Sequence, residues 1–156
     1  AHATTPAVTE GPYFKAGSPE ATVLYQAGMA GTHLVLTGHV LTATCQPVAG
    51  AVLDFWQANA AGAYDNSGYQ LRGHQATAAD GSFRLETVIP GLYPGRTEHI
   101  HVKVQAPGGP VLTTQIFFPG VASNSSDSIY NQALLISLGD AADGGKAGAY
   151  DFYVAG

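Results

Sequence analysis

The sequence predicts an all-β domain folded as a two-sheet β-sandwich. Short apolar stretches rich in β-branched and aromatic residues recur along the chain and are separated by clusters of turn residues. Glycine and proline number 20 and 9, and only 11% of the residues are charged, a composition that suits strands joined by turns better than long helices. We find no convincing long helix and no internal repeat, so the 156 residues are expected to form about seven strands in one domain.

The first strands are predicted after a short tail. Residues 1–10 are small and rich in threonine, so we expect a flexible N-terminal tail before a single domain at 11–156. Residues 32–43 alternate as a strand does, and Gly38 near the middle indicates a bulge or bend. Residues 51–58 are apolar on both faces, as expected for a central strand, and Asp54 within them requires a polar partner.

A long polar connection follows at residues 59–75. Such a long, glycine-rich connection is unusual inside a compact domain, so a functional loop is the better interpretation. It carries Tyr64, Tyr69, Arg72 and His74.

The second half of the chain continues the strand pattern. Residues 83–89 and 98–104 are predicted strands, and residues 111–118 return as a hairpin partner with Gln115 facing the pocket. Residues 124–128 are predicted as a solvated loop. Two further strands are expected at 133–138 and 149–154, with a cluster of turn residues between them.

The stretch 91–104 organises the prediction of function. Alternation along its second half directs His99 and His101 to one side, about 7 Å apart, close enough to converge on one metal ion. Tyr93 and Arg96 precede them in a segment rich in glycine and proline, where a tight connection is favoured over a helix. A His-x-His pair on a strand is also typical of a solvated polar face, so the spacing alone is weak evidence.

Several classes of function are excluded or disfavoured. The net charge is −5 and the six basic residues are scattered, so no basic surface for nucleic acid is expected. No apolar run approaches the roughly 18 residues that a membrane helix requires. The single cysteine, Cys45, is interpreted as an inert structural thiol. The alanine at position 1 fits a mature exported protein or a trimmed chain, and we expect a secreted or extracytoplasmic protein in preference to a cytoplasmic one.

Five blocks in order along the chain resemble the intradiol ring-cleavage dioxygenases: GPYF at 11–14, DFWQANAAGAYD at 54–65, LRGHQATAADGSFR at 71–84, YPGRTEHIHVKV at 93–104 and TTQIFFPG at 113–120. The resemblance implies a sandwich of mixed strands with long functional loops. It also implies a non-haem Fe(III) enzyme that cleaves catechols between their hydroxyls with O2, giving cis,cis-muconate-type products.

The resemblance further implies a role for particular residues. Tyr93 and His101 would be axial iron ligands, and Tyr64 and His99 equatorial ligands. Arg96 and Gln115 would stabilise negative charge that develops on the ring, and Tyr93 would be released when the catechol binds. The ring pocket would be lined by Tyr13 and Tyr69 together with Arg96.

The chemistry of these residue types agrees with the ligand set that the resemblance implies, but it also allows other kinds of site. Phenolate oxygens and imidazoles suit a trivalent iron. An Fe(II) site would need a carboxylate, for which Asp65 is the main local candidate because Glu98 should point away from His99. Arg96 could instead form a surface ion pair with Glu98 or another acid. The remaining alternatives are a zinc or copper site on His99 and His101, and a non-catalytic binding or adhesion module.

The sequence departs from the better-studied members of that family. It lacks the helical N-terminal segment through which catechol-cleaving members dimerise, so a monomer is expected. Only a short connection separates Tyr93 from His99, which implies a more open site for bulkier catechols.

Overall fold

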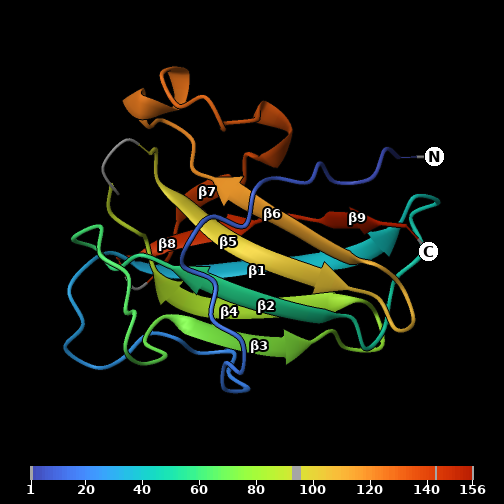
Figure 1. Cartoon of the computed structure of the whole chain (residues 1–156). Helices are drawn as coiled ribbons and strands as arrows, with labels where there is room; N and C mark the ends of the chain where they lie inside the picture. Colours follow the sequence, from blue (N-terminus) through green and yellow to red (C-terminus); the bar gives the residue numbers. More distant parts are fainter. Residues whose placement is uncertain (1, 93–95, 143, 156) are drawn as a thin grey trace.

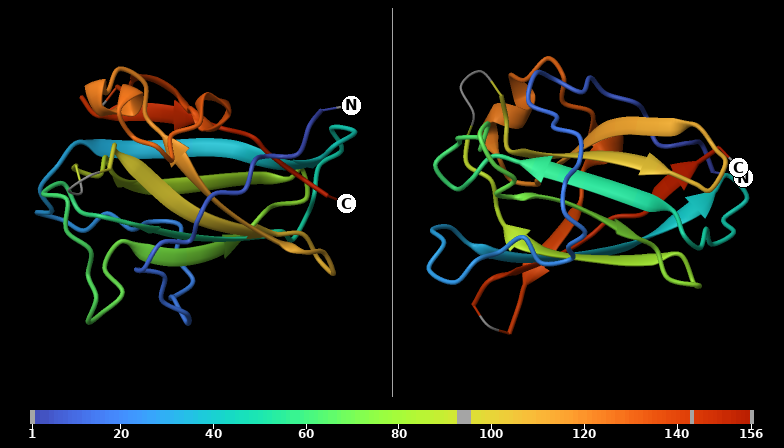
Figure 2. Two further views of the ribbon diagram at one scale, coloured as in Figure 1. Left: turned by 45° about the horizontal axis from the view of Figure 1, so that its top comes forward. Right: turned by 60° about the horizontal axis from the view of Figure 1, so that its bottom comes forward.

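A computed structural model describes residues 2–92, 96–142 and 144–155, which form two facing β-sheets (Figures 1 and 2). The first sheet has the order β4-β1-β8-β7 with β9 beside β1, and contains β1 (His33–Thr42), β4 (Ser82–Val88), β7 (Ser137–Asp140), β8 (Lys146–Ala149) and β9 (Phe152–Val154). The second has the order β3-β2-β5-β6, and contains β2 (Val52–Gln57), β3 (Arg72–Ala76), β5 (His99–Gln105) and β6 (Val111–Phe117). The predicted sandwich of mixed strands is confirmed, because β8 and β9 run parallel to β1 while the other pairs are antiparallel.

Large apolar side chains from the inner faces of both sheets fill the space between them. Period-2 alternation places these side chains inside and their polar neighbours outside. The inner residues are fully buried: Leu34, Leu36, Val40, Leu53, Phe55, Leu85, Ile100, Val102 and Ile116. In the part of the chain that the structure describes, no helix has the length and hydrophobicity that crossing a membrane would need.

Gly38 marks the point where β1 changes its neighbour. Residues 34–37 of β1 pair with β8, and residues 40–42 pair with β9. The Tyr150 backbone between β8 and β9 comes so close that a Cβ added at Gly38 would lie 1.7 Å from the Tyr150 carbonyl oxygen. The glycine is therefore required for this close approach of two backbone segments.

The structure corrects several predicted elements. All but the last residue of β3 falls in the stretch 59–75, which was predicted as a loop. The strand is polar, and nothing in its own composition indicates that it pairs with β2. Of the strand predicted at 149–154, only residues 152–154 form one, β9, whereas β8 lies mostly in the stretch that was predicted as a cluster of turn residues. The strand predicted at 133–138 begins as a 3-10 helix, η2 (Gln132–Leu134), before β7 starts.

Residues 2–10, predicted as a flexible tail, are docked on the protein as part of a segment that we call the N-terminal strap (residues 2–20). The strap crosses the outer face of the second sheet from β6 to β3 (Figure 1). Hydrogen bonds and an ion pair hold it to all four strands: Val8 N to Thr113 O at 2.9 Å, Lys103 Nζ with Glu10 Oε1 at 2.5 Å, Ser18 Oγ to Asp54 Oδ1 at 2.8 Å, and His74 N to Pro19 O at 3.0 Å. Ser18 is thus the partner that half-buried Asp54 requires.

Candidate active site

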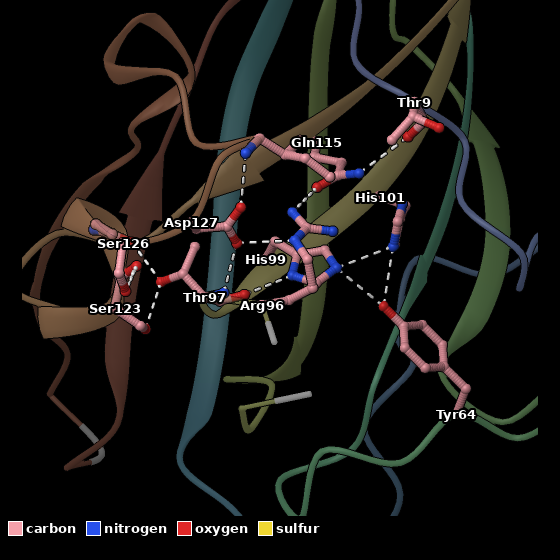
Figure 3. Close-up of polar contacts among 12 residues, drawn as sticks. Thr9, Tyr64, Arg96, Thr97, His99, His101, Gln115, Ser123, Ser126 and Asp127 are labelled. Atoms are coloured by element: carbon pink, nitrogen blue, oxygen red, sulfur yellow. Dashed lines mark hydrogen bonds and ion pairs between the residues drawn. The ribbon is translucent and has the colours of Figure 1, made fainter. Parts of the chain in front are cut away.

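His99 and His101 lie on the outer face of β5, directly beneath the strap. Their alternation with Ile100 is as predicted, but the two imidazoles are not solvated: the residues are only 4% and 2% exposed. Their Nε2 atoms are 3.1 Å apart (Figure 3). The interpretation of His-x-His as a solvated polar face is therefore wrong, because the strap and the loop after β2 cover this part of the sheet.

Tyr64 reaches the two histidines from the loop after β2. Its hydroxyl oxygen is 3.1 Å from His99 Nε2 and 3.0 Å from His101 Nε2 (Figure 3). Asn59 shapes the start of this loop, because its side-chain oxygen accepts hydrogen bonds from two backbone amides at 3.0 Å. The Asn59 carbonyl also accepts from Gly91 N at 2.8 Å, which ties the loop to the segment before β5.

Both imidazoles are held neutral, and His99 directs its lone pair toward Tyr64. Burial lowers the pKa of His99 to about 4, and burial followed by the charge of His99 lowers the pKa of His101 well below its usual value. His99 Nδ1 donates to the Thr97 carbonyl at 2.6 Å, so its Nε2 is the acceptor nitrogen. His101 stacks on Trp56, with ring centroids 4.8 Å apart and planes 8° from parallel.

These three atoms fit a metal ion. A triangle with edges of 3.0–3.1 Å has its centre about 1.8 Å from each corner, so one ion can lie about 2 Å from all three atoms. Among the described residues there is no group of three or more His, Cys, Asp or Glu side chains that could hold a metal. The donors that meet here are a phenol and two imidazoles, a set that suits ferric iron.

The two rival carboxylates do not join this group. Asp65 accepts hydrogen bonds from the amides of Ser67, Gly68 and Gln70 at 2.8–3.1 Å, and these amides lower its pKa to about 2. Its carboxylate therefore shapes the loop that carries Tyr64. Burial raises the pKa of Glu98, which is likewise absent from any cluster of metal-ligating side chains in the described part of the chain.

A cavity of about 210 Å³ opens beside the three atoms. The residues that line it come from the strap, the loop after β2, β5 and its preceding segment, and the loop after β6: Thr9, Gly11, Pro12, Tyr13, Tyr64, Arg96, His99, His101 and Ile129. Tyr13 stacks on Tyr64, with ring centroids 4.5 Å apart. Tyr93, the other predicted tyrosine ligand, lies outside the described residues.

Tyr69 is the one predicted pocket residue that the structure places elsewhere. It is not among the described residues around the cavity. Its hydroxyl donates to the Ala16 carbonyl at 2.8 Å, and the Lys15 ammonium lies 4.3 Å from its ring centroid. The ring thus fastens the outer part of the strap, which sequence proximity to Tyr64 does not indicate.

Arg96 lies on the cavity wall between two partners. Its Nη2 donates to Gln115 Oε1 at 2.6 Å, and Nε donates to Asp127 Oδ2 at 2.8 Å (Figure 3). The Gln115 amide donates in turn to the Thr9 carbonyl at 3.0 Å. An ion pair with an acid was one prediction for Arg96, but the acid is Asp127, not Glu98, and the pair is buried instead of on the surface.

Comparison with known proteins agrees with this geometry. Residues 9–156 match the protein family described as Dioxygenase. Chlorocatechol 1,2-dioxygenase of Rhodococcus opacus is 30% identical over 154 residues, in an alignment that covers 80% of this chain. The chain belongs to the intradiol ring-cleavage dioxygenase family.

Solved structures of other intradiol dioxygenases have the same fold. The dioxygenase domain of a dioxygenase carbohydrate-binding fusion from Streptomyces sp. SirexAA-E is 51% identical, with a TM-score of 0.96 over 98% of this chain and 99% of that one. 3-Chlorocatechol 1,2-dioxygenase of Rhodococcus opacus 1CP is 28% identical, with a TM-score of 0.90 over 98% of this chain and 73% of that one. The chain spans 60% of the Rhodococcus opacus relative above and 50% of hydroxyquinol 1,2-dioxygenase from Rhizobium sp. (strain MTP-10005).

Two residues around this site have buried contacts that the sequence interpretation did not predict. Asp127 falls in the stretch predicted as a solvated loop, yet its side chain is only 2% exposed. Arg72, at the start of β3, donates to the Tyr13 carbonyl at 2.5 Å and to the Asp65 carbonyl at 3.1 Å. An aspartate among serines, and an arginine in a polar loop, carry no local signal that they are buried.

Proposed function

We propose that this protein is a non-haem Fe(III)-dependent dioxygenase that cleaves catechol-type rings between the two hydroxyls and incorporates both atoms of O2, giving cis,cis-muconate-type products. The observation that carries the proposal is the meeting of Tyr64, His99 and His101 within 3.0–3.1 Å at the wall of a cavity. The names of its relatives, which are chlorocatechol, hydroxyquinol and catechol 1,2-dioxygenases, support the same class of substrate.

Tyr64, Tyr93, His99 and His101 are the proposed iron ligands. Ferric iron bound there supplies a Lewis acid that favours the doubly deprotonated catechol and makes its ring electron-rich enough to react with O2. Tyr93, which would help to hold the iron, is also the proposed acceptor of one catechol proton.

The cavity walls supply binding and electrostatic stabilisation. The volume of about 210 Å³ lies below the roughly 300–1,000 Å³ of sites for drug-sized ligands, so it suits a molecule with one ring. Tyr13, Pro12 and Ile129 present apolar surface to that ring. Arg96 carries a permanent positive charge and stabilises the negative charge that develops on the ring, with Gln115 as its hydrogen-bond partner.

Metal analysis and visible spectroscopy of the purified protein test the ligand set first. We expect about one iron per chain and a red-brown colour from tyrosinate bound to ferric iron. A colourless, well-folded protein that contains zinc, copper or no metal would support one of the rival functions instead. Oxygen uptake with catechol, hydroxyquinol, protocatechuate and caffeate then identifies the substrate.

Two substitutions test the individual ligands. Tyr93→Phe and His99→Ala are expected to lower the iron content and to reduce the rate of oxygen uptake by at least about 100-fold, because each removes a proposed ligand. Retention of iron and of full activity in either variant would show that the ligand assignment is wrong.

A further inference from the structure

Asp127 connects three parts of the active site although it does not line the cavity. Oδ2 accepts hydrogen bonds from Arg96 Nε at 2.8 Å and from Thr97 N at 2.7 Å, and Oδ1 accepts from Ile129 N at 2.8 Å. The side chain is only 2% exposed, so water cannot replace these donors. A buried carboxylate with three donors is a strong and rigid anchor.

The anchor acts at one edge of the Arg96 guanidinium while Gln115 acts at another. Nε is held by Asp127 and Nη2 by Gln115, at 2.8 Å and 2.6 Å (Figure 3). Because the N–H bonds of a guanidinium lie in its plane, acceptors on two of its nitrogens restrict both the position and the orientation of the group. Gln115 is a neutral side chain, which is itself held by the Thr9 carbonyl of the strap. Of the two partners of Arg96, Asp127 is the one that carries a charge.

We propose that Asp127 is a positioning residue for catalysis, which holds the Arg96 guanidinium at the cavity wall where negative charge develops on the substrate ring. This inference rests on the proposed ring-cleavage activity. The Asp127 carboxylate also accepts a hydrogen bond from the backbone amide of Ile129, and so it positions an apolar residue of the cavity wall. The hydrogen bond from Thr97 N to the carboxylate fixes Thr97, whose carbonyl in turn accepts a hydrogen bond from His99 Nδ1.

The first test is Asp127→Asn, which keeps the shape of the side chain but removes its charge. Displacement of a charge-stabilising group by about 1 Å lowers kcat by about 100-fold, and we expect a loss of that order with a much smaller change in KM. The iron content and the visible tyrosinate band should stay as in the unaltered protein. Asp140→Asn is the matched control, because it removes an exposed carboxylate that pairs with Lys146 and should change none of these values. A kcat for Asp127→Asn that equals that of the unaltered protein would overturn the proposal.

A double-mutant cycle shows whether Asp127 acts through Arg96, and its Arg96→Lys variant tests the proposal by itself if Asp127→Asn folds poorly. Arg96→Lys retains the charge but cannot bond Asp127 and Gln115 in the same plane, so it should lower kcat by a similar factor. Adding Asp127→Asn to Arg96→Lys should then cause little further loss. Multiplicative losses, or an Arg96→Lys variant with full activity, would contradict the proposal. If the unaltered protein consumes no oxygen with any catechol, the proposed function fails, whereas the inference fails alone if that protein is active and the cycle is additive.

Discussion

At the scale of single residues, the site buries two imidazoles and a phenol side by side. Burial of these polar groups is unfavourable unless one partner, such as a metal ion, binds all three. His99 and His101 are buried and neutral, and Tyr64 brings a third polar atom to within 3.1 Å of each. A bound cation would reverse the preference of the phenol for its protonated form, while protons compete with the metal for the imidazoles. Acidity should therefore affect both the stability of the metal-free protein and its capacity to bind metal.

We predict that the metal-free protein becomes less stable as the pH falls from about 6.5 toward 4. In this window the unfolded chain protonates His99 at its usual pKa of 6.5, whereas the folded chain keeps it neutral until about pH 4. The unfolded state thus binds more protons, and the difference for His99 alone corresponds to about 3 kcal/mol. Urea unfolding at a series of pH values measures the effect. His99→Asn should weaken the dependence, and an equally steep dependence in that variant would contradict the assignment to His99.

Asp65 and Tyr64 are adjacent and offer a direct comparison of two candidate ligands. Asp65→Asn should keep the iron and its visible band, because the carboxylate is committed to the backbone amides of the loop. Tyr64→Phe should weaken and shift the band, because Tyr93 alone would then supply a tyrosinate, and should lower the affinity for iron by about 10- to 100-fold. Iron titration followed at the visible band measures both variants. Loss of the band in Asp65→Asn alone would instead support the carboxylate as ligand.

Much of the candidate site was predictable at this scale. The outward direction of His99 and His101 follows from strand alternation, and the same is true of Gln115, which pairs with His101 across β5 and β6. Tyr64 was indicated by resemblance rather than by spacing. Burial of Asp127 was not predictable, because two of its three donors come from residues about 30 positions earlier in the chain.

At the scale of elements, Arg72 joins the strap to the loop after β2. One side chain donates to the Tyr13 carbonyl and to the Asp65 carbonyl, and these two segments carry the stacked rings of Tyr13 and Tyr64. The fixed fork of a guanidinium can bond two acceptors at once, whereas an ammonium on a flexible stem does so less well. The stack at the cavity wall therefore depends on the start of β3.

Arg72→Lys is predicted to loosen this junction. A buried carbonyl that loses its donor costs about 1–3 kcal/mol of stability, and we expect a loss in that range together with a higher KM for catechol. Chemical unfolding and oxygen uptake measure the two effects. Arg84→Lys is the control, since the Arg84 side chain is 54% exposed and its contact with Glu86 is 3.4 Å long. Equal results for the two variants would contradict a junction at Arg72.

The strap and β3 were the elements that sequence analysis placed least well, for one physical reason. Local composition reports turns and alternation, but residues 2–10 are ordered by partners on β6 and β5, and β3 by pairing with β2. Such contacts join residues up to about a hundred positions apart. The hairpin of β5 and β6, whose partners are close in sequence, was predicted almost to the residue.

At the scale of the whole molecule, Gly38 allows the long strand β1 of the first sheet to pair with two short parallel strands, β8 before it and β9 after it. A Cβ at this position would meet the Tyr150 carbonyl at 1.7 Å and cannot be relieved by rotating a side chain, because the obstacle is backbone. Glycine is therefore needed at this position because the neighbouring backbone at Tyr150 comes so close, and not because of the conformation of β1 itself.

Gly38→Ala should therefore destabilise the entire domain by about 3 kcal/mol, the upper end of the range for overpacking, without altering the iron ligands. Thermal unfolding measures this change. Gly139→Ala on the edge strand β7 is the matched control, because a Cβ added there meets nothing within 4 Å. A melting temperature for Gly38→Ala equal to that of the control would show that the sheet can shift to make room.

The strap has a consequence for how this enzyme family can be engineered. The side chains of Thr9, Pro12 and Tyr13 at the cavity wall lie on the outer face of the second sheet and are not part of the apolar core between the sheets. Libraries that vary these positions could thus retune substrate choice while the scaffold keeps its folding stability.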